Sequence, residues 1–530
     1  MIWNRRSVLQ VGSLAAAGAL IPTAACRAQA RLPEGARAGQ IADLEAGLKS
    51  GRFVWNSGNM AAEVAGDPAG GVYVSSSSDP TGRTGAWVRQ WDGGLQPEWF
   101  GALGDGVTND TSALAALAAF VNRKGGGEIS LRRTTYLVGR QSRRPTGPFA
   151  YAPDPILVFK RCRRPLMVRG NGARLKCAQG LRYGTFDGAT DRASHNKAPY
   201  YGPGRATPYW AMIQVEDCTG AIEISNLELD GSLESLRLGG IWGDAQGGRQ
   251  IGAFGLALYN NRGREVVRDV YAHHHALDGI MIDGPDADRA AENLFERVRC
   301  EYNGRQGLSV VGGRNYAFVD SKFNHTGRGK ILSAPGAGVD IEAEAGKTVR
   351  KLRFANCEFS NNAGCGLVAE SGAAEDVAFQ ACTFIGTTNW AAWPRKPGMR
   401  FDSCTFVGPV TNCYGDARNP AAATQFTNCL FRDDPRLSPN GQVYLPGPIV
   451  ALSQTPNVTF KRCDFRLTHG HVLPWTQSEV IFGDCTMSQR KKDVAYPRGT
   501  FLGRNTITGN VDLTGAKIIG ELTVNGVRRT

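Results

Sequence analysis

The sequence predicts an all-β solenoid, in which short parallel strands wind into stacked coils. A motif of an apolar residue, two residues, Cys, one residue and an aromatic recurs about every 22 residues, with insertions. It reads FANCEF, FQACTF, FDSCTF, FTNCLF and FKRCDF. A second pattern, Gly followed by apolar, any and apolar or small residues, recurs ahead of and among these motifs. Glycine is abundant, with 67 residues in 530, which suits a turn-rich β architecture more than a helical one.

The Cys/Phe motif predicts the inside of the coils. Its centres are Cys300, Ser321, Cys357, Cys382, Cys404, Cys429, Cys463 and Cys485. Residues two apart point to the same side of a strand, so the Cys and the Phe face one interior. Coils stack about 4.8 Å apart, so equivalent inward residues form columns. We expect buried free thiols, because the chain shows no CxxC pair or Cys/His cluster that would bind metal.

The Gly pattern predicts one strand per coil of a long parallel sheet. Its anchors are Gly255, Gly279, Gly307, Gly338 and Gly366. The residues one and three after each Gly should face inward, and those two and four after should face outward. Earlier strands are expected near 156–159, 175 and 222–229, which gives roughly ten to twelve coils.

The segment from Trp99 to Gly139 predicts how the winding begins. It holds a Gly/Asp/Asn-rich loop at 101–109, then a helix with apolar residues at Leu114, Leu117, Ala118 and Val121, then Gly125-Gly126-Gly127 and two short β-rich runs. Asp110, Thr111 and Ser112 are possible N-caps of this helix.

This segment resembles the entry of the pectate-lyase-like (rhamnogalacturonase- and epimerase-like) right-handed parallel β-helix superfamily, with Asn109 where the family usually has Asp. The resemblance implies a single-stranded right-handed parallel β-helix, in which the helix caps the first coil. It indicates a protein that acts on polysaccharides and leaves the reaction open, since many activities share the fold.

Four regions are expected along the chain. Residues 1–30 resemble a twin-arginine export signal, with Arg5 and Arg6 before an apolar run and Ala28-Gln29-Ala30 as a cleavage site. An ordinary Sec signal, or lipidation at Cys26, is the alternative. Residues 31–96 should form a small β-rich N-terminal appendage, 97–510 the β-helix, and 511–530 a C-terminal β cap. The expected location is periplasmic or secreted.

The formal net charge is +13, which favours an acidic partner. For an exported β-helix this indicates an acidic polysaccharide, and no nucleic-acid motif is visible. No run after the signal is long and apolar enough to span a membrane. The sequence leaves open whether the chain is a monomer or a trimer.

Carboxylates gather on the outward positions of neighbouring Gly strands, at Asp278, Asp283, Asp340 and Glu342. Hydrolysis of a glycosidic bond needs two carboxyl groups, about 6.5 to 9.5 Å apart for inversion. Asp340 and Glu342 leave the same face roughly 7 Å apart, and Asp283 lies two coils away. We predict paired-carboxylate hydrolysis here. The alternatives are Ca²⁺ binding, as in some pectate lyases, and simple solvation of the sheet; no other cofactor is expected.

A second group of residues supports lyase or epimerase chemistry instead. His274 and His275 precede Asp278, and the next coils carry Tyr302, Arg305, Gln306, His325 and Lys330. A uronate lyase or epimerase needs a base for the C5 proton, here His or Tyr, and a cation for the carboxylate, here Arg305. The competing interpretation is a ladder of polar turns.

Aromatic residues in two insertions are expected to stack on sugar rings. They are Tyr201 and Trp210 in the insertion 179–210, and Trp390 in a later one. The predicted substrate contacts are completed by Tyr302, Gln306, His325 and Lys330. A third alternative, a non-catalytic glycan-binding protein, also fits this pattern.

Overall fold

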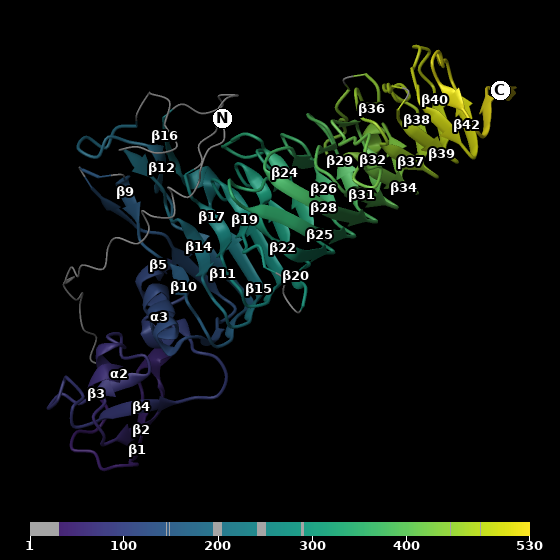
Figure 1. The fold of residues 1–530 in the computed structure, drawn as a ribbon. Helices are drawn as coiled ribbons and strands as arrows, with labels where there is room; N and C mark the ends of the chain where they lie inside the picture. Colours follow the sequence, from purple (N-terminus) through teal and green to yellow (C-terminus); the bar gives the residue numbers. More distant parts are fainter. Residues whose placement is uncertain are drawn as a thin grey trace.

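The computed structural model describes residues 31–144, 146–147, 149–193, 204–240, 251–287, 291–445, 447–477 and 479–529. The predicted signal, residues 1–30, and Tyr201 lie outside these ranges. Figure 1 shows an elongated stack of coils that runs from the capping helix to the C-terminus, with a small sheet at its N-terminal end.

The N-terminal sheet is antiparallel and has its own core. Its strands, in spatial order, are β1 (Ile41–Leu44), β2 (Gly51–Asn56), β4 (Ala86–Gln90) and β3 (Tyr73–Ser75). A short helix, α2 (Ala61–Ala65), lies within the same segment. Phe53, Trp55 and Trp87 are buried together, which explains the apolar residues of this β-rich region.

Helix α3 (Thr111–Lys124) covers the first coils. It buries Leu114, Leu117 and Val121 and ends at Gly125, whose φ of 74° is readily adopted by glycine. Asp110 occupies the N-cap position, as one of the three candidates, but its carboxylate accepts from the backbone N–H groups of Leu103 and Gly104 and makes no capping bond to the helix. The residue therefore fixes the loop before the helix.

The coils have three faces, each built from parallel strands. The first face is formed by β10 (Leu157–Lys160), β14 (Ala211–Glu216), β17 (Phe254–Tyr259), β19 (Asp278–Asp283), the start of β22 (Gln306–Val319), β24 (Ala337–Ile341), β27 (Leu367–Ala369), β30 (Ala392–Pro394), β33 (Val410–Thr411) and β36 (Val450–Ala451). These are the predicted Gly strands and their earlier and later equivalents.

The second face is formed by β6 (Gly127–Ser130), the starts of β11 (Leu166–Cys177), β15 (Ile222–Asp230) and β18 (Glu265–His273), β20 (Asn293–Glu296), the end of β22, β25 (Thr348–Ala355), β28 (Ala373–Gln380), β31 (Met399–Asp402), β34 (Gln425–Thr427), β37 (Thr459–Lys461), β39 (Ile481–Gly483), β41 (Thr500–Leu502) and β43 (Lys517–Ile518). One residue with positive φ, such as Asn226 or Asp269, turns the chain into the third face.

The third face is formed by β5 (Asp105–Asn109), β7 (Thr135–Val138), the ends of β11, β15 and β18, β21 (Arg299–Glu301), β23 (Lys322–Asn324), β26 (Glu358–Ser360), β29 (Thr383–Ile385), β32 (Thr405–Val407), β35 (Leu430–Arg432), β38 (Asp464–Leu467), β40 (Thr486–Gln489), β42 (Arg504–Thr508) and β44 (Glu521–Val524). The parallel coils extend beyond residue 510, where the sequence predicted a cap to begin. β45 (Val527–Arg529) then pairs antiparallel with β44.

A further five-stranded sheet is built from the insertions between early coils. Its strands are β16 (Arg237–Gly239), β12 (Arg182–Thr185), β13 (Arg205–Ala206), β9 (Phe149–Pro153) and β8 (Gln141–Arg143). The 3₁₀ turns are η2 (Gly47–Lys49), η3 (Pro97–Phe100), η4 (Leu233–Ser235) and η5 (Pro435–Leu437). No helix among the described residues is long and apolar enough to cross a bilayer.

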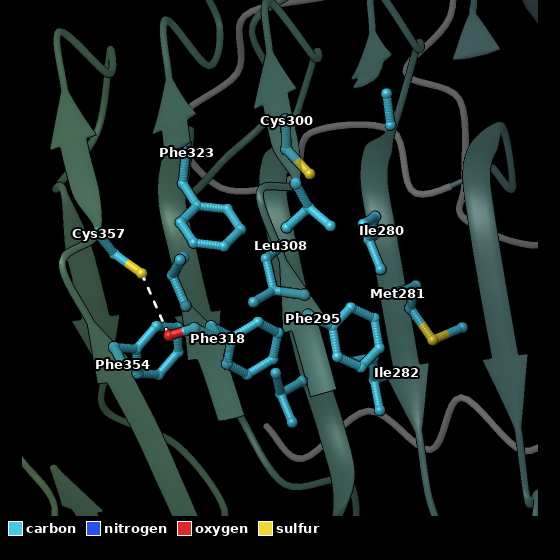
Figure 2. Close-up of a cluster of buried hydrophobic side chains, with 14 of the residues drawn as sticks. Ile280, Met281, Ile282, Phe295, Cys300, Leu308, Phe318, Phe323, Phe354 and Cys357 are labelled. Atoms are coloured by element: carbon cyan, nitrogen blue, oxygen red, sulfur yellow. Dashed lines mark hydrogen bonds between the residues drawn. The ribbon is translucent and has the colours of Figure 1, made fainter. Parts of the chain in front are cut away.

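The interior consists of columns of Phe and Cys, as the repeat predicted. Phe354, Phe379, Phe401, Phe426 and Phe460 form one stack, with successive ring centroids 4.7 to 4.9 Å apart. The twelve described cysteines are free and buried, which confirms the prediction of buried thiols for that part of the chain. The six motif thiols from Cys357 to Cys485 each donate to a backbone carbonyl of the preceding coil, as Cys357 does to the Phe318 carbonyl at 3.4 Å (Figure 2).

The Gly anchors are required by the spacing of the coils. A Cβ built on Gly279 would lie 2.8 Å from the carbonyl oxygen of Gly307, and one on Gly307 would lie 2.6 Å from that of Gly338. Such contacts are shorter than side-chain carbons allow, so no larger residue fits at the start of these strands. The anchors therefore fix the register of the first face.

Candidate functional site

The outward positions of the first face lie in register from coil to coil. One column follows Ala257, Met281, Ser309, Asp340, Val368 and Trp393. The neighbouring inward column follows Leu256, Ile280, Leu308 and Val339, which are fully buried. Asp340 lies in the column that alternates with this inward one, and the residues of both columns up to Asp340 are buried, with Ala257 and Met281 packed into the same core cluster.

The predicted carboxylates have cationic or amide partners on the neighbouring coils. Asp340 accepts a hydrogen bond from the Gln306 side chain, which starts the strand before it. Asp278 Oδ2 lies 3.4 Å from Arg305 Nη1. Two predicted site residues therefore orient or neutralise carboxylates in this structure.

Asp283 forms an ion pair with Lys347, whose ammonium also lies 3.7 Å from Glu344 Oε2. Glu342 follows the end of β24, and its backbone N–H donates to the Val310 carbonyl. Glu342 is half-buried, whereas Asp340 is only 5% exposed. Asp340 and Glu342 thus combine a sheltered carboxylate with a more accessible one on the same coil.

The outward acids are more buried than solvated groups on a sheet surface. Asp278 is fully buried and Asp283 is 6% exposed. This disfavours the interpretation that they merely solvate the sheet, since burying a charge is costly without partners. The Arg305 and Lys347 partners supply the compensating charge, so these acids are paired, mostly buried groups of the first face.

Aromatic residues lie at both ends of this row of carboxylates. Trp210 donates through its indole N–H to the Tyr259 hydroxyl at 3.2 Å, and Tyr259 directly precedes Asp283 in a column that starts with Lys160 and Glu216. Trp393 lies two coils beyond Asp340, with its ring centroid 5.1 Å from that of Trp390. The partly exposed Trp210, Trp390 and Trp393 rings offer flat faces for sugar stacking, whereas Tyr259 is only 4% exposed and serves to hold Trp210.

His275 is not accessible to a substrate. It is fully buried, its Nδ1 lies 2.9 Å from the Tyr209 hydroxyl, and its Nε2 lies 3.0 Å from the Leu229 carbonyl oxygen. Burial lowers the pKa of His275 to about 3, so the ring is neutral at ordinary pH. Both ring nitrogens are engaged in hydrogen bonds. The structure therefore assigns His275 a role in holding the insertion 179–210, through Tyr209, against the coils.

His274, Tyr302 and His325 form a ring stack at the corner between the third and first faces. Each has a φ between 54° and 57°, as does Asn361 on the next coil. The ring centroids of His274 and Tyr302 are 5.1 Å apart, and those of Tyr302 and His325 are 4.6 Å apart. The ladder of polar turn residues that was the competing interpretation is therefore present. Three of its coils carry rings, at His274, Tyr302 and His325, and the next carries the amide of Asn361.

The stack makes one prediction about pH. Burial lowers the pKa of His325 in the folded chain. Below about pH 6.5 His325 therefore becomes protonated more readily in the unfolded chain than in the folded chain. Stability is therefore lost as the pH falls below that value. We expect His325→Tyr, which copies Tyr302 at the same φ, to weaken this loss. Urea unfolding of variant and wild type at about pH 7.5 and pH 5.5 measures it; equal pH dependence in both would contradict the prediction.

Lys330 serves the fold rather than an open groove. Its backbone N–H donates to Glu234 Oε1, and its ammonium donates to the Leu236 carbonyl at 2.7 Å. The side chain therefore ties the loop after β23 to the turn η4. Tyr201 lies outside the described residues, so its predicted stacking role stays a prediction.

Sequence reasoning missed a polar cluster on the third face. Asp230, His273 and His274 place their ligand atoms within 4.8 Å of one another. His273 also contacts Glu228, at 3.1 Å from Nε2 to Oε1. Asp230 and His273 are partners in register although 43 positions separate them in the chain. Aligning the run LELD on VYAH would have placed them side by side.

Comparison with known proteins agrees with the architecture. The family model described as "Right handed beta helix region" matches residues 249–393, which include β17 to β29 and the row of carboxylates. This chain contains a right-handed parallel β-helix. The match supplies the hand of the coils and confirms the predicted fold class. A search of curated proteins gives no significant match.

Several solved β-helix structures resemble the chain at low identity. The tailspike protein gp49 of Acinetobacter baumannii bacteriophage Fri1, a capsular polysaccharide depolymerase, is 13% identical with a TM-score of 0.49, over 91% of this chain and 74% of its own. The mannuronan C-5 epimerase AlgE4 A-module of Azotobacter vinelandii is 16% identical with a TM-score of 0.37, over 80% and 98%. Similarity at this level leaves the reaction to be argued from the site itself.

Proposed function

We propose that this β-helix is an exported enzyme that cleaves glycosidic bonds of an acidic polysaccharide by hydrolysis. The observation that carries the proposal is the group of carboxylates on the β19 and β24 coils of the first face, two coils apart, with partly exposed tryptophan rings on both sides. The net charge of +13 supports an acidic polymer as substrate. Periplasmic or secreted location is part of the proposal and follows from the signal-like residues 1–30.

Asp340 and Glu342 are the proposed catalytic pair. They lie two residues apart on one coil with about 7 Å between their backbones, a spacing from which two carboxyl groups can reach the separation that inversion requires. One carboxyl protonates the leaving oxygen, and the other activates a water molecule on the opposite face of the sugar. Gln306 orients Asp340 through its hydrogen bond.

Trp393 and Trp210, both partly exposed, are proposed to bind sugar rings on either side of this pair. The outward column places Trp393 about 10 Å from Asp340, which is two coil spacings. A chain of several sugars would therefore contact the acids and the aromatic ring together. Remote contacts of this kind hold the reacting bond in position.

Lyase or epimerase chemistry is the second candidate, and the stack of His274, Tyr302 and His325 favours it. An imidazole at this corner would serve as the base. The predicted cation is less suited to the task, because Arg305 is 2% exposed and lies beside Asp278. The burial of Arg305 is the reason that hydrolysis is preferred here.

The test is incubation of the full chain with a panel of uronate-containing polysaccharides and one neutral polymer. We expect new reducing ends without the ultraviolet absorbance of an unsaturated product. Reducing ends together with that absorbance would establish a lyase. Deuterium uptake from heavy water without cleavage would establish an epimerase. Binding without any of these changes would overturn the enzymatic proposal in favour of a glycan-binding protein.

A further inference from the structure

The cluster of Asp230, His273 and His274 brings two imidazoles and one carboxylate together on the third face. Asp230 ends β15, His273 ends β18 in register with it, and His274 begins the corner. Asp230 and His273 are each 5% exposed, and His274 is half-buried. Two paired strands and the first residue of the following turn therefore supply the group.

The nitrogen that His273 presents to the cluster is set by its neighbour. Its Nε2 lies 3.1 Å from Glu228 Oε1, so the ring proton belongs on that nitrogen. The lone pair of Nδ1 then points to His274 Nδ1, at 2.6 Å, and to Asp230 Oδ1, at 3.9 Å. A carboxylate bound to the far nitrogen is the arrangement that orients metal-ligating histidines.

Both rings are also fixed by stacking. Tyr271 lies over His273 with ring centroids 4.1 Å apart, and Tyr302 lies over His274 at 5.1 Å. Asp230 is fixed in turn, because Arg174 binds its Oδ2 and the Ser232 backbone N–H donates to its Oδ1 at 2.8 Å. The three donor groups are thus preorganised. The Arg174 guanidinium pairs with both the Asp230 and the Glu228 carboxylate.

We propose that Asp230, His273 and His274 bind a divalent transition-metal ion of the zinc type, with Glu228 as the carboxylate that orients His273. Two imidazoles select such an ion over Ca²⁺ or Mg²⁺, which take oxygen ligands. Two nitrogens bound at about 2.1 Å in tetrahedral geometry lie about 3.4 Å apart, so His274 would shift by less than ~1 Å. Three protein ligands leave a fourth position for water or a substrate oxygen.

This site is separate from the proposed hydrolysis on the first face. The carboxylate row uses β19, β24 and the loop after it, whereas the metal ligands end β15 and β18. Metal binding and cleavage therefore succeed or fail independently. If His274 holds a metal, it is not available as the free base of a lyase.

The experiment uses the full chain without a polyhistidine tag, stripped with a chelator and titrated with Zn²⁺ by calorimetry and with Co²⁺ by visible absorption. We expect one ion per chain and the intense visible bands of tetrahedral Co²⁺. His274→Asn and Asp230→Asn should weaken binding at least about 100-fold. Glu228→Gln should weaken it about 10- to 100-fold, as loss of an orienting carboxylate does.

The column of corner residues that contains His274 also offers control variants for folding and for the specificity of the metal effect. Asparagine suits the corner, since Asn361 occupies the equivalent position at a φ of 54°, so His274→Asn should fold. His325→Asn removes another ring of the same stack outside the cluster and should leave the affinity unchanged. The proposal is overturned if wild type binds no stoichiometric Zn²⁺, or if circular dichroism shows a folded His274→Asn that binds as tightly as wild type.

Discussion

Asp340→Asn and Glu342→Gln are each expected to lower kcat for polysaccharide cleavage about 100- to 10,000-fold, the usual contribution of a general acid or base. Both substitutions keep the size of the side chain and remove only its ability to transfer a proton. KM should change by no more than a few fold, because the lost interaction belongs to the transition state. Initial rates from reducing-end release measure both constants.

A matched control is available on the next coil. Glu370 follows Gly366 as an outward residue and forms an ion pair with Arg395 at 3.0 Å, with its carboxylate 45% exposed. Glu370→Gln removes a carboxylate of the same strand position outside the proposed pair. We expect its kcat to stay within about two-fold of wild type, since exposed ion pairs contribute little.

The double variant separates a catalytic pair from two independent charges. If Asp340 and Glu342 act as one unit, losing both should cost little more than losing either. Full activity in both single variants, together with loss of activity in His274→Asn, would reject hydrolysis by this pair. Thermal unfolding of each variant shows whether a lost rate reflects lost structure.

The columns of the coil interior could be predicted because they depend on local spacing. Residues two apart share a face of a strand, so Cys357 and Phe359 had to point the same way whatever the length of the loops. The Gly anchors are similarly local, since each needs only a neighbouring coil at close range. The positions of β19 and β24 on the first face followed directly from Gly279 and Gly338.

The partners of the site residues depend on lengths that the sequence does not reveal. Asp230 and His273 meet because β15 and β18 pair in register across 43 positions of the chain, and only an alignment of LELD with VYAH points to that pairing. For the same reason Arg305 was expected to face a substrate, whereas it lies beside Asp278 on the neighbouring coil. Contacts such as that of Arg305 with Asp278 depend on how far a side chain extends toward the neighbouring coil.

The burial of His275 shows a second limit. A run of three histidines gives no signal of which ring turns inward, because the corner rotates successive side chains by amounts set by a single positive φ at His274. His275 then meets Tyr209, which arrives from an insertion that the repeat pattern cannot place. The backbone conformation at His274 therefore leaves the His274 ring half-buried and turns the His275 ring into the core.

Phe426→Ala is expected to destabilise the β-helix by about 3 to 5 kcal/mol, the usual loss for a buried phenylalanine. Phe426 is fully buried between Phe401 and Phe460, with ring centroids 4.9 and 4.8 Å away, and meets Phe431 edge-on at 5.7 Å. Removing it breaks two stacked contacts and leaves a cavity that the flanking coils cannot close, since their backbones are hydrogen-bonded on both sides. Urea unfolding followed by circular dichroism measures the loss.

The same substitution tests whether the coils behave as a solenoid. Each coil contacts only its neighbours, and Phe426 on β34 lies several coils beyond Asp340 on β24. Phe426→Ala should therefore lower the urea midpoint while kcat at 25 °C stays near wild type. Phe426→Leu, which keeps most of the volume, should cost only about 1 to 2 kcal/mol. A large fall in kcat with the fold intact would mean that packing changes travel along the stack to the carboxylates, in contradiction to nearest-neighbour coupling.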